Sequence, residues 1–369
     1  MNKSKLFNKI LNITGFSGAI TLGFVACGPG AADLSIMPTG QSTYQGSVAN
    51  NKVDVLWVID NSGSMYTKQE KLGAGFNSFV NVFTTKSFDF RMAVTSSDTR
   101  ATPTGQAGEF QSLPYPYQHP TDASRSNPAN YVGANGPSVK IITNSTTNLA
   151  NHFISNVRVG DTGDANAKVL DAVTLALSSS NLAGANTGFL RSDAHLAVIL
   201  VSDADDGDIN FGLGSTASIT DVQNTLQTLK PDRFDVITRK YKKNFTVSAV
   251  VVNNPADTNC VAPFEEGIEF KQLANATNGS IANICDNDFS SGLTQISQRI
   301  AEAITEIPLA QVPNVSTIRI LFNGVDVPQN STNGWSYQSS GNKVVFHGSY
   351  IPADNTNISV LYTPNDIIR

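Results

Sequence analysis

The chain has few basic residues for its length. Its 25 lysines and arginines are outnumbered by 30 aspartates and glutamates, which gives a formal net charge of -5. Nucleic-acid binding requires clustered Lys and Arg side chains that neutralise phosphates. We therefore expect no nucleic-acid partner.

Histidine is also scarce. The chain has 4 histidines, and their scattered positions resemble neither a catalytic triad nor a zinc site. They are His119, His152, His195 and His347. His195 opens an apolar run, so we interpret it as a packing or edge residue. The sequence therefore gives little support to an enzyme.

The chain lacks a good candidate for a membrane-spanning helix near the N-terminus. Its apolar stretch there, residues 10–26, is too short and too rich in Gly, Ser and Thr. This stretch follows Lys3, Lys5 and Lys9, and it ends in small residues. A basic start, a short apolar segment and small residues before the cleavage point are typical of a bacterial secretory signal. We predict a signal peptide over residues 1–26.

The end of this segment, Phe24-Val25-Ala26-Cys27, resembles a lipobox, in which the cysteine is lipidated and becomes the first residue of the mature chain. Phe24 departs from the usual Leu. The alternative is an ordinary signal peptide followed by a free thiol, which would be a liability on a secreted chain. Because Gly28 replaces the Asp that retains lipoproteins at the inner membrane, the resemblance favours a lipid anchor in the bacterial outer membrane.

Cysteine is rare, with 3 in the chain. If Cys27 carries lipid, Cys260 and Cys285 remain as an even pair in an oxidising compartment, and a disulfide between them is the natural inference. Residues 27–48 contain Gly, Pro, Ser and Thr with little periodicity, and we interpret them as a flexible tether.

The remaining chain is long enough for a main domain, 49–308, and a smaller one, 309–369. Strands alternate with helices in the main domain, which predicts an α/β fold with a doubly wound, mostly parallel sheet covered on both faces. We expect strands near 53–59, 90–95, 195–202 and 245–252, and helices near 66–83, 165–178, 219–230, 266–276 and 288–306.

Residues 97–156 are rich in Pro, Asn, Ser and Tyr and form an expected insertion, in which Tyr115, Tyr117 and Tyr131 are candidates for a recognition surface. An insertion that binds no partner is an equally good interpretation. After residue 308, period-two alternation and the Asn323-Gly324 pair predict a small antiparallel β domain.

The most informative segment is Asp60-Asn61-Ser62-Gly63-Ser64, which directly follows the apolar run 53–59. A strand that ends in an acid and two hydroxyls places hard oxygen groups at the carboxyl edge of a sheet, where ligands bind in open α/β folds. Hard oxygens favour Mg²⁺ or Ca²⁺. A Ser-rich turn without metal is the alternative.

This D-x-S-x-S turn between strand and helix resembles the von Willebrand factor type A (VWA) domain, where the same pattern begins the metal-ion-dependent adhesion site. The resemblance implies that Asp60, Ser62 and Ser64 belong to such a site. It also places the family's threonine ligand at Thr162, in Gly160-Asp161-Thr162, and its distal aspartate at Asp203, after the run 195–202. Thr162 is alternatively a helix N-cap.

The family pattern implies that Asp60 and Asp203 bind the ion mostly through water, while Ser62, Ser64 and Thr162 contact it. One open position is left for a carboxylate of a protein ligand. The expected ion is Mg²⁺, with Ca²⁺ or Mn²⁺ as alternatives. Without a cation or a proton between them, two nearby carboxylates repel each other.

The acidic stretch from Asp205 to Asp208 fails the EF-hand pattern, because the Gly and the final ligand fall at the wrong positions. We interpret it as a solvated rim of the site, with a weak second Ca²⁺ site as the alternative.

The sequence thus predicts a lipid-anchored protein of the bacterial cell envelope that binds an acidic side chain of a protein ligand through a divalent ion. A metal-independent scaffold, a domain whose ion is only structural, and a metal-dependent hydrolase with Asp60 or Asp203 as base remain alternatives. The sequence does not indicate the oligomeric state.

Overall fold

The computed structural model describes residues 42–45, 51–86, 88–100, 107–112, 139–163, 167–206, 215–235, 240–260, 264–352 and 356–365. The predictions for the signal peptide, for Cys27 and for the three tyrosines of the insertion lie outside these residues. None of the helices within the described ranges has the length and apolar character needed to cross a bilayer.

A six-stranded sheet in the order β4-β3-β2-β5-β8-β9 forms the centre of the main domain. Its strands are β2 (Lys52–Ile59), β3 (Asp89–Ser96), β4 (Ile142–Thr143), β5 (His195–Ser202), β8 (Phe245–Val251) and β9 (Ile281–Asn283). Only β4 runs antiparallel to its neighbour. The predicted doubly wound, mostly parallel α/β sheet is confirmed.

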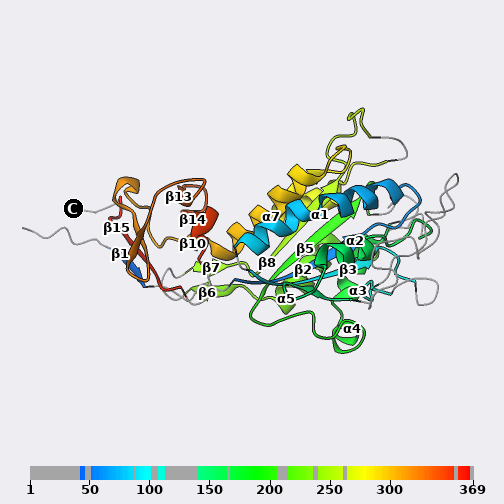
Figure 1. Ribbon diagram of the computed structural model, residues 1–369, viewed down its shortest axis with the longest axis horizontal. Coiled ribbons are helices and arrows are strands. Elements are labelled where there is room, and N and C mark those ends of the chain that lie inside the picture. The colour runs from blue at the N-terminus through cyan, green and yellow to red at the C-terminus, as the bar shows by residue number, and fades with distance from the viewer. Residues whose placement is uncertain are drawn as a thin grey trace, which may run out of the picture. The chain divides into compact units, whose positions relative to one another are not determined.

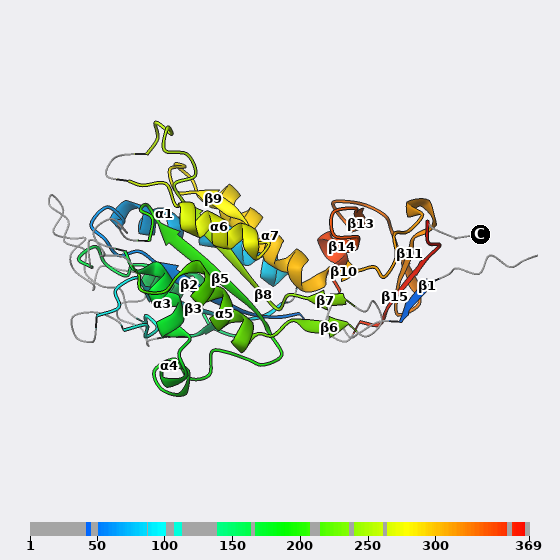
Figure 2. The same ribbon diagram turned by 180° about the vertical axis from the view of Figure 1, so that it is seen from behind.

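Helices cover both faces of this sheet (Figures 1 and 2). They are α1 (Tyr66–Thr85), α2 (Leu149–Asn156), α3 (Val169–Ala176), α4 (Ser179–Ala183), α5 (Ile219–Leu229), α6 (Ile268–Ala276) and α7 (Ser290–Thr305). Trp57 and Ile59 of β2 pack in one core with α1, α2 and α7, whereas Leu56 and Val58 pack in the other with α3, α5 and α6. The near-continuous hydrophobicity of β2 follows from this burial on both faces.

The structure adds a helix that the sequence did not predict. Helix α2 lies inside the expected insertion, and its Phe153 stacks on Phe76 of α1 with ring centroids 3.8 Å apart. Phe153 also meets Trp57 edge-on at 5.2 Å. The end of the insertion is therefore part of the main core, because it brings a buried aromatic side chain to the α1 face.

The C-terminal region contains antiparallel strands, as predicted. They are β10 (Ile307–Pro308), β11 (Arg319–Phe322), β12 (Val325–Val327), β13 (Gly334–Gln338), β14 (Lys343–His347) and β15 (Ile358–Tyr362), with short 3-10 helices at Val315–Thr317 and Gly348–Tyr350. Asn323 and Gly324 both have positive φ, at 49° and 85°, and they connect β11 to β12 as the predicted hairpin turn.

Strand β1 (Ser42–Gln45) falls in the segment that we interpreted as tether, and it pairs antiparallel with β15. Its partner is more than 300 residues away in sequence, so local composition carries no signal for this pairing. A further hairpin joins β6 (Arg233–Asp235) to β7 (Lys240–Lys242).

Candidate metal and ligand site

Strands β2 and β5 are adjacent and parallel, and the chain moves outward from them in opposite directions, to β3 on one side and to β8 on the other. This is the point where the strand order reverses, which is where ligands bind in open α/β sheets. Asp60 follows β2 and Asp203 follows β5. The topology therefore brings the two predicted acids to one place at the carboxyl edge.

Asp60 is fully buried at this edge. Its Oδ1 accepts a hydrogen bond from the Ser62 backbone N–H at 2.8 Å, and its Oδ2 accepts one from the Ser202 hydroxyl at 2.7 Å. Burial raises the pKa of Asp60 to about 6, although these hydrogen bonds oppose the shift. Hydrogen bonds thus hold the carboxylate in position, and no lysine or arginine among the described residues forms an ion pair with it.

Asp203, 1% exposed, receives two different donors. The Ser64 hydroxyl donates to its Oδ1 at 2.8 Å, and the Lys68 ammonium donates to its Oδ2 at 2.7 Å. The hydroxyls of Ser62 and Ser64 lie 3.4 Å apart. Ser62, Ser64 and Asp203 therefore form one contiguous oxygen cluster next to Asp60.

The loop that carries Thr162 lies next to this cluster, but the Thr162 side chain does not contact it. Gly163 N–H donates to the Asn61 carbonyl at 2.9 Å, and the Gln69 side chain bridges the carbonyls of Asp60 and Gly160. Thr162 itself is exposed, and none of the described residues hydrogen-bonds to its hydroxyl. Because the N-cap of α3 is Lys168, Thr162 does not cap that helix.

The loop approaches the turn so closely that a side chain at Gly163 has no room. A Cβ there would lie 2.1 Å from Asn61 Oδ1, whereas a Cβ at Gly63 would have its nearest neighbour at 3.7 Å. Gly163 therefore sets the distance between the Thr162 loop and the D-x-S-x-S turn.

The acidic stretch behind Asp203 is not the solvated rim that we expected. Asp206 is 6% exposed and accepts a hydrogen bond from the Leu170 N–H in the first turn of α3. Asp205 accepts from the N–H groups of Ile268 and Glu269 in the first turn of α6. The rim interpretation is wrong for Asp206, because that side chain is buried, whereas Asp205 is half-buried. Both carboxyl groups lie where helix N-termini attract negative charge. Asp208 lies outside the described residues.

Three polar residues of the site were missed from the sequence. Ser202 and Ser97 contact Asp60, the latter at 3.5 Å, and both stand at the ends of strands next to β2. Their position at the ends of predicted strands could have identified them as site residues. Lys68 lies in the first turn of α1, where a cation is disfavoured by the helix dipole, so its position there needs a compensating anion.

The donor set fits a hard divalent cation, because buried carboxylates and hydroxyls converge while soft donors are absent from these contacts. No described group of three or more His, Cys, Asp and Glu side chains is arranged to hold a metal ion. The predicted site contains only two carboxylates, and its other ligands are hydroxyls. A metal ion there does not require a group of three His, Cys, Asp or Glu side chains.

Cys260 and Cys285 form a disulfide, with Cα atoms 4.8 Å apart, near the end of β9. His195 is buried, and its Nε2 lies 3.2 Å from the Thr246 hydroxyl, as expected for a packing residue.

Comparisons with known proteins give distant similarities of structure. The chain is similar to proximal thread matrix protein 1 from the mussel byssus, with 14% identity and a TM-score of 0.37 over 73% of this chain and 52% of that one. It is also similar to the pilus adhesin SpaC from Lactobacillus rhamnosus GG in its open conformation, with 12% identity and a TM-score of 0.36 over 87% of this chain and 40% of that one.

The chain thus spans about half or less of the length of these two proteins. No protein-family model matches the sequence. No curated protein matches it either.

Proposed function

We propose that this chain is a VWA-like protein of the bacterial cell envelope that binds a protein ligand through a divalent cation. Asp60, Ser62, Ser64 and Asp203 would hold the cation, with Thr162 added from the neighbouring loop. The observation that carries the proposal is the pair of buried carboxylates at the switch point, Asp60 and Asp203. They are connected through Ser62, whose N–H donates to Asp60, and Ser64, whose hydroxyl lies next to that of Ser62 and donates to Asp203.

The cation, Mg²⁺ or alternatively Ca²⁺ or Mn²⁺, would supply positive charge to which a carboxylate of the ligand binds. The protein's own groups do the positioning. Ser62 N–H and Ser202 hold the Asp60 carboxylate, while Ser64 and Lys68 hold that of Asp203. A pre-oriented site reduces the ordering cost of binding.

Lys68 has to release Asp203 for this function. Its ammonium already neutralises Asp203 and also donates to the Ser64 carbonyl at 2.9 Å. Since it is on a flexible side chain with 17% exposure, it has a path to solvent. Metal binding is therefore an exchange of one cation for another.

The same contact favours a second candidate, a metal-independent scaffold of an envelope complex. In that case Lys68 is the permanent cation of the site, and the protein partner is bound by other surfaces. The two candidates differ in whether a divalent ion displaces Lys68.

We favour binding over catalysis for the site itself. Among the described residues, Ser62 and Ser64 contact each other and a carboxylate, and no histidine reaches them as a base. The membrane attachment belongs to the proposal as well. It rests on the resemblance of the segment before Cys27 to a lipobox, and the lack of Asp at position 28 favours the outer membrane.

Calorimetric titration of Mg²⁺, Ca²⁺ and Mn²⁺ into the purified chain tests the proposal. Ser62→Ala is expected to abolish binding with little change in melting temperature. Asp203→Ala is expected to abolish binding and to lower the melting temperature as well, because it leaves the Lys68 ammonium without its carboxylate. Ser180→Ala, at an exposed serine of α4, is the matched control and should bind like the parent. No binding to the parent chain would favour the metal-independent scaffold.

A further inference from the structure

The loop that carries Thr162 is fixed on both sides of that residue. Before it, the carbonyl of Gly160 accepts a hydrogen bond from the side-chain amide of Gln69 at 2.7 Å. After it, the Gly163 N–H donates to the carbonyl of Asn61 at 2.9 Å. Thr162 thus lies between two hydrogen bonds to the turn and to α1, and these bonds determine its position relative to the oxygen cluster.

Gln69 makes its part of this connection from a buried position. It is the fourth residue of α1, and its exposed fraction is 0%. Its Nε2 also donates to the carbonyl of Asp60 at 3.1 Å. A side-chain amide nitrogen carries two N–H groups, so one group serves each carbonyl. The amide therefore connects the residue that follows β2 to Gly160, which is 91 residues away from Gln69 in sequence.

Packing fixes the start of the loop but not its tip. Val157 and Val159 are buried in the core that α1 and α7 share, so the chain reaches Gly160 from a fixed direction. Thr162, by contrast, is exposed, and Gly163 is half-buried. The position of the tip therefore depends on hydrogen bonds more than on apolar contacts, and the loss of one such bond is expected to release it.

We propose that Gln69 is a positioning residue for the metal site: it holds the Thr162 loop against the D-x-S-x-S turn, so that the Thr162 hydroxyl can contact the ion. This inference rests on the proposed function, because it takes the proposed cation site as given. Gln69 acts through the loop, since its Nε2 donates to two backbone carbonyls. A loop that is already in place reduces the ordering cost of binding.

Calorimetric titration of Mg²⁺ into the purified chain tests the proposal through a double-mutant cycle. Gln69→Leu removes both donors at similar size, and we expect it to weaken binding about tenfold, as is usual for residues coupled through one hydrogen-bond network. Thr162→Ala should weaken binding by a similar factor. Because Gln69 acts through the Thr162 loop, the double variant should bind no more weakly than Thr162→Ala alone. Full additivity of the two effects overturns the proposal.

Asn186→Leu is the matched control for Gln69→Leu. Asn186 is also fully buried, and its Nδ2 donates to the carbonyls of Gly108 and Ala176, both at 2.9 Å. Its replacement should lower the melting temperature by a similar amount and leave the affinity for Mg²⁺ at the parent value. An equal loss of affinity in both variants would show a response to general destabilisation and would overturn the role of Gln69.

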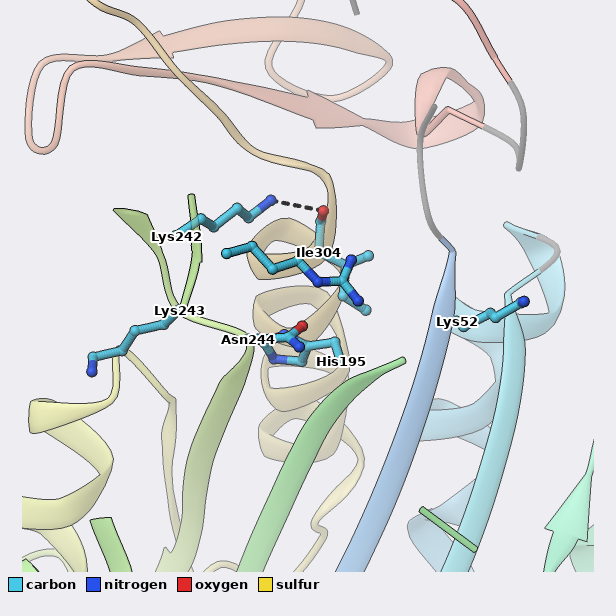
Figure 3. A pocket seen from close by; sticks show the side chains of 7 residues that line it. Lys52, His195, Lys242, Lys243, Asn244 and Ile304 are labelled. Atoms are coloured by element: carbon cyan, nitrogen blue, oxygen red, sulfur yellow. Dashed lines mark hydrogen bonds between the residues drawn. The ribbon is translucent and has the colours of Figure 1, made fainter. Parts of the chain in front are cut away.

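The opposite edge of the sheet provides a second control, Asn244→Leu. Figure 3 shows Asn244 beside His195, at the start of the strand that Asp203 follows at its other end. The cavity at this edge is also lined by four cationic side chains: Lys52, Arg233, Lys242 and Lys243. Asn244 is 7% exposed, so its replacement disturbs a buried amide without touching the Thr162 loop. Binding of Mg²⁺ should be that of the parent, and a loss equal to that of Gln69→Leu overturns the proposal.

A measurement without metal separates this proposal from the proposed function. Hydrogen exchange of the Gly163 N–H reports whether the loop is in place, because this group donates to the Asn61 carbonyl. Gln69→Leu should speed its exchange about tenfold in the metal-free chain, whereas Asn186→Leu should not. Gln69→Asn, which shortens the side chain by one carbon, replaces Gln69→Leu if that variant folds poorly.

The two readouts together distinguish the possible failures. No binding of Mg²⁺ to the parent chain overturns the proposed function, and this proposal with it. Binding of Mg²⁺ to the parent, combined with an unchanged Gly163 exchange in the Gln69 variants, overturns this proposal alone. Faster exchange with weaker, non-additive Mg²⁺ binding supports it.

Discussion

The Lys68 ammonium lies 2.7 Å from Oδ2 of Asp203, a carboxylate that is 2% exposed. Removing the partner of a buried charge is costly, so an ionised Asp203 requires a cation beside it. In the structure that cation belongs to the protein, and the proposed ligand-binding state replaces it by a divalent ion.

Replacing Lys68 should therefore strengthen metal binding. In Lys68→Met the competing ammonium is absent, and we expect the affinity for Mg²⁺ to rise about tenfold, which corresponds to ~1.4 kcal/mol. Lys71→Met is the control, because Lys71 is on the same helix but donates to the Asp286 carbonyl. Calorimetry provides the measurement, and an unchanged affinity in Lys68→Met would show that Lys68 does not compete with the ion.

Gly163 should be sensitive to a single added methyl group. In Gly163→Ala the Cβ would lie 2.1 Å from Asn61 Oδ1, so the loop or the turn has to move. We expect a loss of about 1–3 kcal/mol in unfolding free energy, the usual cost of overpacking. Gly63→Ala, whose Cβ has no neighbour closer than 3.7 Å, is the control and should be nearly neutral. Denaturant unfolding compares them, and equal stability would contradict the close approach of the loop.

Asp206 should make stability depend on pH. Burial raises its pKa from 3.8 to about 7, so the folded state holds a proton that the unfolded state releases. Its contribution is therefore fully present below pH 3.8 and is lost as the pH rises through about 7.

Asp206→Asn has no such group but keeps an acceptor for the Leu170 N–H. We expect the unfolding free energy of the parent, relative to this variant, to fall between pH 4 and 7 by on the order of a few kcal/mol. Melting curves of both proteins across this range provide the test. A constant difference between them would show that Asp206 is not a buried acid with a raised pKa.

The disulfide should stabilise the fold because it closes the loop between its two cysteines and so lowers the entropy of the unfolded chain. Cys260 and Cys285 are separated by 25 residues, and closing such a loop stabilises by about 3 kcal/mol in the chain-entropy model. We expect reductant to lower the melting temperature of the parent, and Cys260→Ser with Cys285→Ser to melt at the reduced value with or without reductant. A parent melting curve that does not respond to reductant would argue against the bond.

Much of the fold was predictable because it depends on local patterns. The strand before Asp60 and that before Asp203 are apolar runs bounded by polar residues, and both appear in the structure as β2 and β5. The Asn323-Gly324 turn was readable for the same reason, since few residues accept positive φ. Helix α2 and strand β1 were not predicted, because distant partners, Trp57 and β15, stabilise them.

For the candidate site, the sequence by itself determined the chemistry: an acid and two hydroxyls after one buried strand and an acid after another. Only the tertiary structure decided the charges around them. It placed Lys68 on Asp203, turned Asp205 and Asp206 toward helix N-termini, and grouped four cations at the opposite edge. The physical reason is that the ligand groups follow one another along the chain and can be identified from the sequence. Their electrostatic partners come from distant segments that meet only when the sheet is assembled.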